Sequence, residues 1–145
     1  MNLYKKTEYM LYNYKDLIAK EMNLTLDIRD LKLNYEGIRA AQYKEHTGNT
    51  NKFNSNVENE IISKEKKIEY LESVKEHIQI KIKKIESAIA ALEDRQKKII
   101  ELRYFNKLSW NKISELINLT EVSCRVIRNK SIKKLQLLLF NDKVT

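Results

Sequence analysis

Apolar residues recur with heptad spacing along the first forty residues of the chain. One series has members seven residues apart: Leu3, Met10, Leu17, Leu24, Leu31 and Ile38. A second series follows four residues after the first: Thr7, Tyr14, Glu21, Ile28 and Tyr35. This alternation predicts one face of a helix, which three more residues widen: Tyr4, Leu11 and Ile18. Because Asn34 and Gly37 weaken the pattern, the helix could end before Ile38.

A second heptad pattern follows a polar stretch at about residues 44–56, which is rich in Asn and Thr and which we interpret as a linker. The pattern has eleven positions: Val57, Ile61, Lys64, Ile68, Leu71, Lys75, Ile78, Ile82, Ile85, Ile89 and Leu92. Nine of the eleven are apolar, so they predict a long helix. The two heptad segments could form an antiparallel hairpin within one chain, or each could pair with a second copy.

From residue 93 onward, helix-capping signals become frequent. Asp94 is expected to cap a helix whose inner face carries Ile99, Leu102 and Phe105, with Ile100 and Tyr104 at its edge. Trp110 is expected to pack against this helix.

Two more caps follow. Ser109 and Thr120 each precede a helical stretch, and each is flanked by a pair of residues at the positions of a hydrophobic staple: Leu108 with Ile113, and Leu119 with Cys124. Asn118 stands where a residue tolerant of the left-handed conformation is needed. The last helix should bury Cys124, Ile127, Ser131 and Leu135, and expose Glu121, Val122, Arg125, Val126 and Asn129. A helix, a short turn and a second helix form the helix-turn-helix layout.

Composition supports an all-α fold, because the chain has no Pro and only two Gly among its 145 residues. The predicted architecture is a coiled coil or helical hairpin at residues 1–92, followed by a three-helix, helix-turn-helix domain at residues 93–145. A lone cysteine cannot form an internal disulfide. We expect no membrane association and a cytoplasmic location, since the start of the chain lacks the apolar core of a signal peptide.

The net charge of +8 is concentrated at the C-terminal end. Residues 1–92 carry 16 basic and 14 acidic residues, a net of +2, whereas residues 93–145 carry 12 and 6, a net of +6. No acidic residue lies between Val122 and Asn141. An anionic partner should therefore bind the C-terminal third, and residues 1–92 should supply self-association or a platform. A fragment from about Ala90 onward is expected to retain nonspecific DNA binding.

The stretch DRQKKIIELRYFNKLSWNKISELINLTEVSCRVIRNKSIKKLQ resembles region 4 of sigma-70-type factors. The matching positions are Leu102, Arg103, Tyr104, Leu108, Ser109, Ile113, Ser114, Leu116, Asn118, Leu119, Thr120, Cys124, Arg125, Lys130, Ser131, Lys134 and Leu135. The whole layout, with its KTEYMLYNYKDL opening, is similar to phage late-gene transcriptional activators of the RinA and ArpU kind.

This resemblance implies that five residues face the major groove of double-stranded DNA: Glu121, Val122, Ser123, Arg125 and Val126. It also implies that five basic residues contact phosphate or RNA polymerase: Lys112, Arg128, Lys130, Lys133 and Lys134. Arg125 is the expected base reader, because a guanidinium group matches both acceptors of guanine. Arg128 could instead complete the fold by pairing with Glu101 or Glu115.

We predict no enzymatic activity and no cofactor. His46 and His77 lie far apart in the sequence, Cys124 is expected to face the core, and no Gly-rich phosphate loop is present. The leading interpretation is a sequence-specific regulator that acts with RNA polymerase at a late promoter. A ring-forming DNA-packaging protein of the small-terminase type, and a polymerase-binding regulator with little DNA affinity, are the alternatives. A homo-oligomer is compatible with each.

Overall fold

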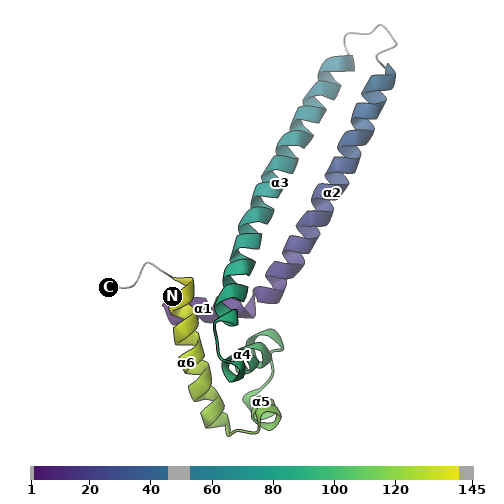
Figure 1. The fold of residues 1–145 in the computed structure, drawn as a ribbon. Helices are drawn as coiled ribbons and strands as arrows, with labels where there is room; N and C mark the ends of the chain where they lie inside the picture. The colour runs from purple at the N-terminus through teal and green to yellow at the C-terminus, as the bar shows by residue number, and fades with distance from the viewer. Residues whose placement is uncertain (1, 46–52, 141–145) are drawn as a thin grey trace. The chain divides into compact units, whose positions relative to one another are not determined.

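The structure is a computed structural model that describes residues 2–45 and 53–140. Within these ranges it is all-helical, which confirms the predicted fold class (Figure 1). Six α-helices and one π-helix follow in order: α1 (Leu3–Tyr12), α2 (Tyr14–Glu45), α3 (Phe53–Ala90), α4 (Asp94–Ile100), η1 (Glu101–Phe105), α5 (Trp110–Ile117) and α6 (Glu121–Leu139). None of these helices has both the length and the apolar character that a membrane span needs.

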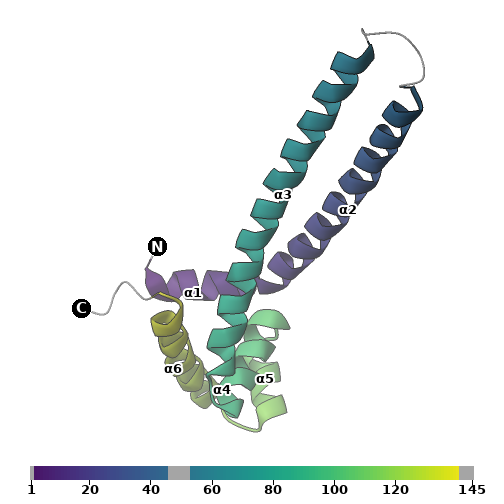
Figure 2. The ribbon, with the colours of Figure 1, turned by 45° about the horizontal axis from the view of Figure 1, so that its top comes forward.

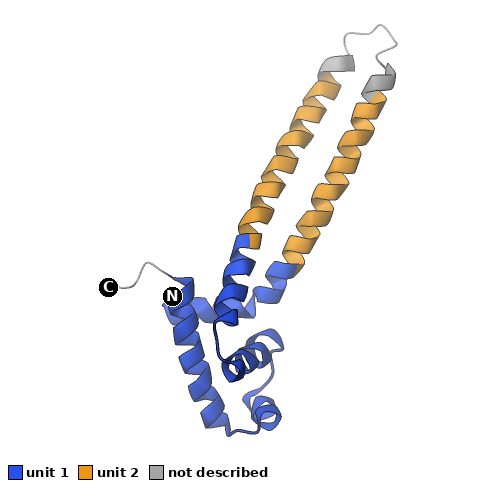
Figure 3. Cartoon of the chain, viewed as in Figure 1, with its two compact units in different colours: residues 1–18, 80–145 blue, residues 19–79 orange. Residues whose placement is uncertain are grey.

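The chain divides into two compact units, which are coloured separately in Figure 3. Residues 19–79 form the first, called here the hairpin unit, and residues 1–18 together with 80–145 form the second, called the bundle unit. The predicted boundary between residues 92 and 93 lies inside the bundle unit. That residues 93–145 act as a DNA-binding domain stays a prediction.

In the hairpin unit, α2 and α3 pair in antiparallel fashion within one chain. Glu21 accepts a hydrogen bond from Gln79 at 3.0 Å, and Lys32 forms a 3.0 Å ion pair with Glu72. Partners for residues further along α2 therefore lie earlier along α3. The buried side chains between the helices include Leu24 and Ile68, both of which occupy predicted heptad positions. All eleven positions of the second heptad pattern are buried or half-buried; ten lie in α3, and Leu92 follows the end of that helix.

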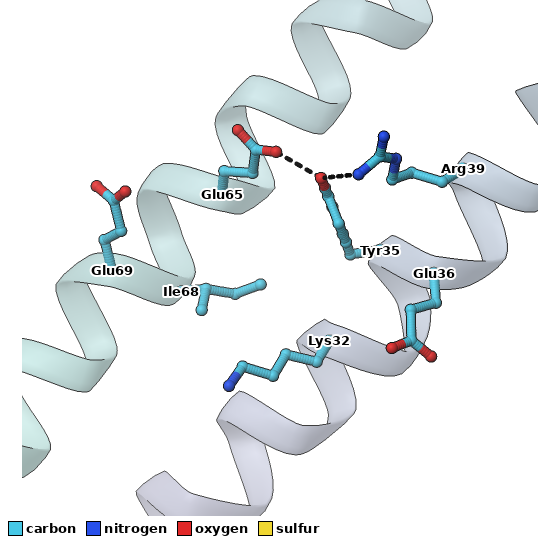
Figure 4. A pocket seen from close by; sticks show the side chains of 7 residues that line it. All are labelled: Lys32, Tyr35, Glu36, Arg39, Glu65, Ile68 and Glu69. Atoms are coloured by element: carbon cyan, nitrogen blue, oxygen red, sulfur yellow. Dashed lines mark hydrogen bonds between the residues drawn. The ribbon is translucent and has the colours of Figure 1, made fainter.

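An open pocket of about 570 Å³ is lined by residues of both α2 and α3 (Figure 4). Here the helices are bridged by Tyr35, whose hydroxyl donates to Glu65 Oε1 and accepts from Arg39 Nη1 at 3.1 Å. The hydrogen bond to Glu65, followed by burial, raises the pKa of Tyr35. Acidic and basic side chains line the pocket together, so its charge does not select one class of ligand.

Two expectations about the first heptad segment were wrong. The helix continues through Gly37 to Glu45, because one helical glycine costs only about 1 kcal/mol relative to alanine. The segment is also interrupted at Asn13, whose side-chain Nδ2 donates to the carbonyl of Tyr9 at 2.7 Å. Such a local bond competes with the helical pattern. Residues 46–52 of the predicted linker lie outside the described residues.

Buried residues from α1, the end of α3, η1 and α6 form a core of the bundle unit. Figure 2 shows the ribbons of α1, α3 and α6. Leu11 comes from α1, Ile85 from α3, Tyr104 from η1, and Ile132 and Leu135 from α6. Helix α1 packs on both α6 and η1. The N-terminal helix is therefore part of the core that supports the C-terminal helices.

The first C-terminal helix differs from expectation at both ends. Its N-cap is Glu93, not Asp94, and the Glu93 backbone N–H donates to the Gln96 side chain at 3.2 Å. The helix then widens into the π-helix η1, where the Asn106 N–H donates to the Glu101 carbonyl at 2.9 Å. Ile100 and Tyr104, expected at the edge, are completely buried because α1, α3 and α6 cover that side.

Candidate nucleic-acid interface

The turn between α5 and α6 is fixed by side-chain caps at each helix start. The Ser109 hydroxyl accepts from the Lys112 N–H at 3.2 Å, and the Thr120 hydroxyl accepts from the Ser123 N–H at 3.1 Å. Asn118 is left-handed, with φ 63° and ψ 43°, and its N–H donates to the Ser114 carbonyl at 2.9 Å. These contacts confirm the predicted caps and the predicted turn residue, and they satisfy backbone groups at the helix ends.

A second core holds α5 and α6 against the helix that precedes them. Its buried members are Ile99, Leu102, Trp110, Ile113 and Cys124. Four half-buried residues pack against them: Leu108, Ile117, Leu119 and Ile127. Both predicted staple pairs thus lie in this cluster, and Trp110 packs with α4 and η1 as expected. Burial, followed by the nearby charge of Glu121, raises the pKa of the Cys124 thiol, which makes it a weak nucleophile.

The outward face of α6 is the face that the sequence predicted. Six residues on it are exposed: Glu121, Val122, Ser123, Arg125, Val126 and Asn129. Val122 is 69 % exposed and Val126 is 48 % exposed. The first turns of α6 therefore present acidic, apolar, hydroxyl and basic groups to solvent side by side.

Three arginines surround the buried indole of Trp110. The guanidinium carbons of Arg103, Arg128 and Arg125 lie 4.8, 4.9 and 5.8 Å from the ring centroid. Contacts of this length between a cation and an aromatic ring are attractive. Arg125 is the one exposed member of the three, so its side chain is positioned near the ring and remains accessible from outside.

Arg103 was singled out in the sequence only as a position of the sigma-like motif, and its contacts could not be predicted from spacing. Its Nη1 donates to the Leu108 carbonyl at 3.0 Å, which ties η1 to the loop before α5. Its Nε is buried and has no hydrogen-bond partner among the described residues. Arg103 therefore supports the position of α5 from inside the bundle unit.

Arg128 belongs to a polar network that joins α1 to α6. Its Nη1 lies 3.6 Å from Glu8 Oε2 and 3.4 Å from the Tyr104 hydroxyl, which itself donates to Glu8 at 2.7 Å. Asn129 Oδ1 accepts from Tyr4 at 2.7 Å and from Arg128 at 2.9 Å. The acid that pairs with Arg128 is thus Glu8, not Glu101 or Glu115.

This network shifts the protonation equilibria of its members. Burial, followed by the hydrogen bond to Glu8, raises the pKa of Tyr104 well above its usual value. Burial also raises the pKa of Tyr4. Burial lowers the pKa of Arg128, but the hydrogen bond to Tyr104 and the charge of Glu8 are among the interactions that outweigh it, so the net shift is upward. The network therefore keeps Arg128 protonated and Tyr104 neutral.

The four lysines of the predicted set differ in how far they are engaged. Lys130 and Lys133 are exposed on α6. Lys112 is also exposed and lies 4.0 Å from Glu115. Lys134 donates to the Ala91 carbonyl at 2.9 Å, just beyond the end of α3. Three of the four can therefore meet an anionic partner without giving up a hydrogen bond.

No group of three or more His, Cys, Asp or Glu side chains in the described part of the chain could hold a metal ion. His77 is exposed on α3, and His46 lies outside the described residues. The absence of enzymatic activity stays a prediction.

The chain belongs to the family described as "Protein of unknown function (DUF722)", whose model matches residues 4–137. The match runs from α1 to near the end of α6, so it includes both the hairpin unit and the bundle unit. No curated protein and no solved structure matches the chain.

Proposed function

We propose that this DUF722 protein is a DNA-binding transcription regulator that inserts the N-terminal turns of α6 into the major groove. The observation that carries the proposal is the exposed face of α6. The helix caps at the turn and the core beneath α5 and α6 hold this helix in place. In a helix-turn-helix protein the second helix reads base edges with its N-terminal residues. The resemblance of residues 94–136 to sigma region 4 favours the same use.

Each exposed group has a complementary feature in the groove. Arg125 can donate two hydrogen bonds to guanine, and Val122 and Val126 can contact thymine methyl groups. Glu121 can accept from the amino group of cytosine, and Ser123 can bond to either kind of edge. A face with this mixture of groups is suited to reading a sequence, whereas a uniformly basic face would bind any DNA alike.

The exposed lysines supply the backbone contacts in this proposal. Lys112 at the start of α5, with Lys130 and Lys133 on α6, would neutralise phosphates on either side of the groove. Arg128 and Lys134 are left out of this set, because their side chains are engaged with Glu8, Tyr104 and Ala91 inside the bundle unit. Recruitment of RNA polymerase at a late promoter is the finer proposal, which the resemblance to phage late-gene activators favours.

Selection of bound fragments from a random duplex library, followed by mobility-shift titration, tests the proposal. The full chain should enrich a defined motif and bind it roughly a thousandfold or more tighter than scrambled DNA. Failure to enrich any motif would contradict sequence-specific reading. If the chain alone fails but enriches a motif when purified RNA polymerase is present, the chain acts through polymerase and has little DNA affinity of its own.

A further inference from the structure

Helix α6 has no acidic residue after Glu121, yet one of its basic residues is neutralised from another helix. Its five basic residues are Arg125, Arg128, Lys130, Lys133 and Lys134. Among the described residues, Arg128 alone of the five forms an ion pair, and its partner is Glu8 of α1. Glu8 is the single acidic residue of α1. The N-terminal helix therefore neutralises one positive charge on the helix that we propose to read DNA.

The pair of Glu8 and Arg128 is sheltered and held from several sides. Arg128 Nη1 lies 3.6 Å from Glu8 Oε2, and the side chains of Arg128 and Glu8 are only 18 % and 23 % exposed. The same carboxylate oxygen accepts from the Tyr104 hydroxyl at 2.7 Å, and Arg128 Nε donates to Asn129 Oδ1 at 2.9 Å. A partly buried pair is screened by salt much less than an exposed one. Arg128 should therefore stay paired at the salt concentrations used to measure DNA binding.

Arg128 nevertheless stands beside the face of α6 that we propose to enter the groove. It follows Arg125 by three residues, which places it about 60° from Arg125 around the helix axis. Both guanidinium groups lie near the Trp110 ring, Arg128 at 4.9 Å and Arg125 at 5.8 Å from its centroid. An arginine at the border of such a face is in the position of a residue that contacts the DNA backbone next to the groove.

We propose that Glu8 keeps Arg128 away from the DNA backbone and so limits the number of phosphates that the chain neutralises. The inference rests on the proposed function, because it concerns the same face of α6. A guanidinium group binds phosphate without regard to base sequence, so a released Arg128 would add a contact on any duplex. Glu8 acts through Arg128 and is a positioning residue, whose effect appears in the salt dependence of binding.

Glu8→Gln in the full chain tests the proposal. It removes the negative charge, while the amide oxygen can still accept from the Tyr104 hydroxyl. The variant should bind a random-sequence duplex more tightly than the wild-type chain does. Its slope of log K against log salt should steepen by about 0.9, for one additional phosphate neutralised. The gain in affinity should therefore shrink by about three- to fourfold between 50 and 200 mM salt.

The matched control is Glu86→Gln on α3. Glu86 also accepts from a tyrosine hydroxyl, that of Tyr14 at 2.6 Å, and no basic side chain in the described part of the chain forms an ion pair with it. Both variants raise the net charge by one, but only Glu8→Gln releases Arg128. Glu86→Gln should keep the wild-type slope. The proposal is wrong if Glu8→Gln gains neither affinity nor slope, or if Glu86→Gln steepens the slope equally.

The double variant Glu8→Gln/Arg128→Gln provides a second test, which leaves the net charge unchanged and no charge unpaired. Since Arg128 contacts no phosphate in the wild-type chain, the double variant should have the wild-type slope. This expectation holds even where circular dichroism shows that Glu8→Gln alone unfolds. A slope lower by about 0.9 would show that Arg128 contacts phosphate despite Glu8, and would overturn the proposal. Motif enrichment by the wild-type chain does not enter these comparisons, so base reading by α6 and restraint of Arg128 can fail separately.

Discussion

At position 125 an arginine has two competing partners, the Trp110 ring inside the chain and a base outside it. The distance of 5.8 Å to the ring centroid is near the limit at which a cation and an aromatic ring attract each other. The side chain is therefore oriented by Trp110 but held weakly. Since an exposed contact of this kind is worth about 0.5–1 kcal/mol, a bidentate bond to guanine would outweigh it.

We therefore predict that Arg125→Ala weakens binding to the selected DNA motif by about 1–3 kcal/mol. Binding to scrambled DNA should change little, so the ratio of the two affinities should fall. Titration of both duplexes at one salt concentration measures this ratio. Arg95→Ala, at an exposed arginine of α4, is the control and should leave the ratio unchanged. Equal losses on both duplexes would contradict base reading by Arg125.

Lys133 should behave differently, because it lies further along α6 and beyond the reach of base edges. Lys133→Ala is expected to weaken selected and scrambled DNA by similar factors. It should also lower the slope of log K against log salt by about 0.9, since one counterion fewer is released. Lys66→Ala in the hairpin unit serves as the control. An unchanged salt slope for Lys133→Ala would show that Lys133 does not neutralise a phosphate.

Sequence alone predicted the outward residues of α6, because burial follows helical spacing and the caps fixed the phase of the helix. It could not predict which basic residues are engaged. Glu8, which pairs with Arg128, and Ala91, which accepts from Lys134, lie far from their partners in the sequence. Spacing along one helix does not predict a contact between α1 and α6. From the sequence, a basic residue that is engaged within the fold therefore cannot be distinguished from one that is free to contact DNA.

At the scale of elements, α1 is the helix whose role the sequence did not indicate. Its heptad residues predicted a helical face correctly, yet they matched a coiled coil as well as a bundle. Asn13 separates α1 from α2, and α1 then packs on η1 and α6. Of the heptad positions, Thr7 is completely buried and Met10 packs in the core with Leu11. The pattern therefore predicted burial correctly but did not predict which elements α1 packs against.

Leu11 is 1 % exposed and lies in the core formed with Ile85, Tyr104, Ile132 and other residues. Leu11→Ala should therefore lower the free energy of unfolding by about 2–5 kcal/mol, through lost burial and the cavity left behind. Urea denaturation followed by circular dichroism measures this. Ile62→Ala, at an exposed position of α3, should change stability by less than about 0.5 kcal/mol. A similarly small effect at Leu11 would show that α1 does not hold the bundle unit together.

The packing of α1 also changes what a fragment from about Ala90 onward should do. Ile100, Tyr104, Ile132 and Leu135 would lose the cover of Leu11, Ile85 and Ile89 in that fragment. We now expect the fragment to unfold or aggregate. Loss of DNA binding in it would therefore not locate the binding site, and tests of DNA binding require the full chain.

Tyr104 gives the contact between α1 and η1 a dependence on pH. Its pKa is raised in the folded chain by burial and by the hydrogen bond to Glu8, whereas an unfolded chain would ionise this tyrosine near its ordinary pKa of about 10. The unfolded state then binds fewer protons above that pH, so the stabilisation is present below about pH 10 and is lost as the pH rises.

We predict that Tyr104 steepens the fall in the free energy of unfolding above pH 10 by up to about 1.4 kcal/mol per pH unit. Burial and its bond to Glu86 raise the pKa of Tyr14 to about 12, so Tyr14 adds to the slope between pH 10 and 12. Tyr104→Phe should make the slope shallower, while Tyr9→Phe, at an exposed tyrosine, should not. Identical slopes in Tyr104→Phe and the wild-type chain would contradict the predicted ionisation behaviour.

At the scale of the whole molecule, the proposed function leads to a statement about DNA sites. A homo-oligomer with one α6 in each chain would bring two of these helices to one DNA molecule. The second contact is then intramolecular and occurs at a high effective concentration, which raises the affinity for a site with two half-sites.

We predict that the selected motif contains two half-sites and is bound by two chains. The wild-type chain should bind the full site tenfold or more tighter than a single half-site, because the second contact gains from the effective concentration. Titration of single and double half-site duplexes measures this difference. Equal affinities for the two duplexes would show that a single chain reads the site alone.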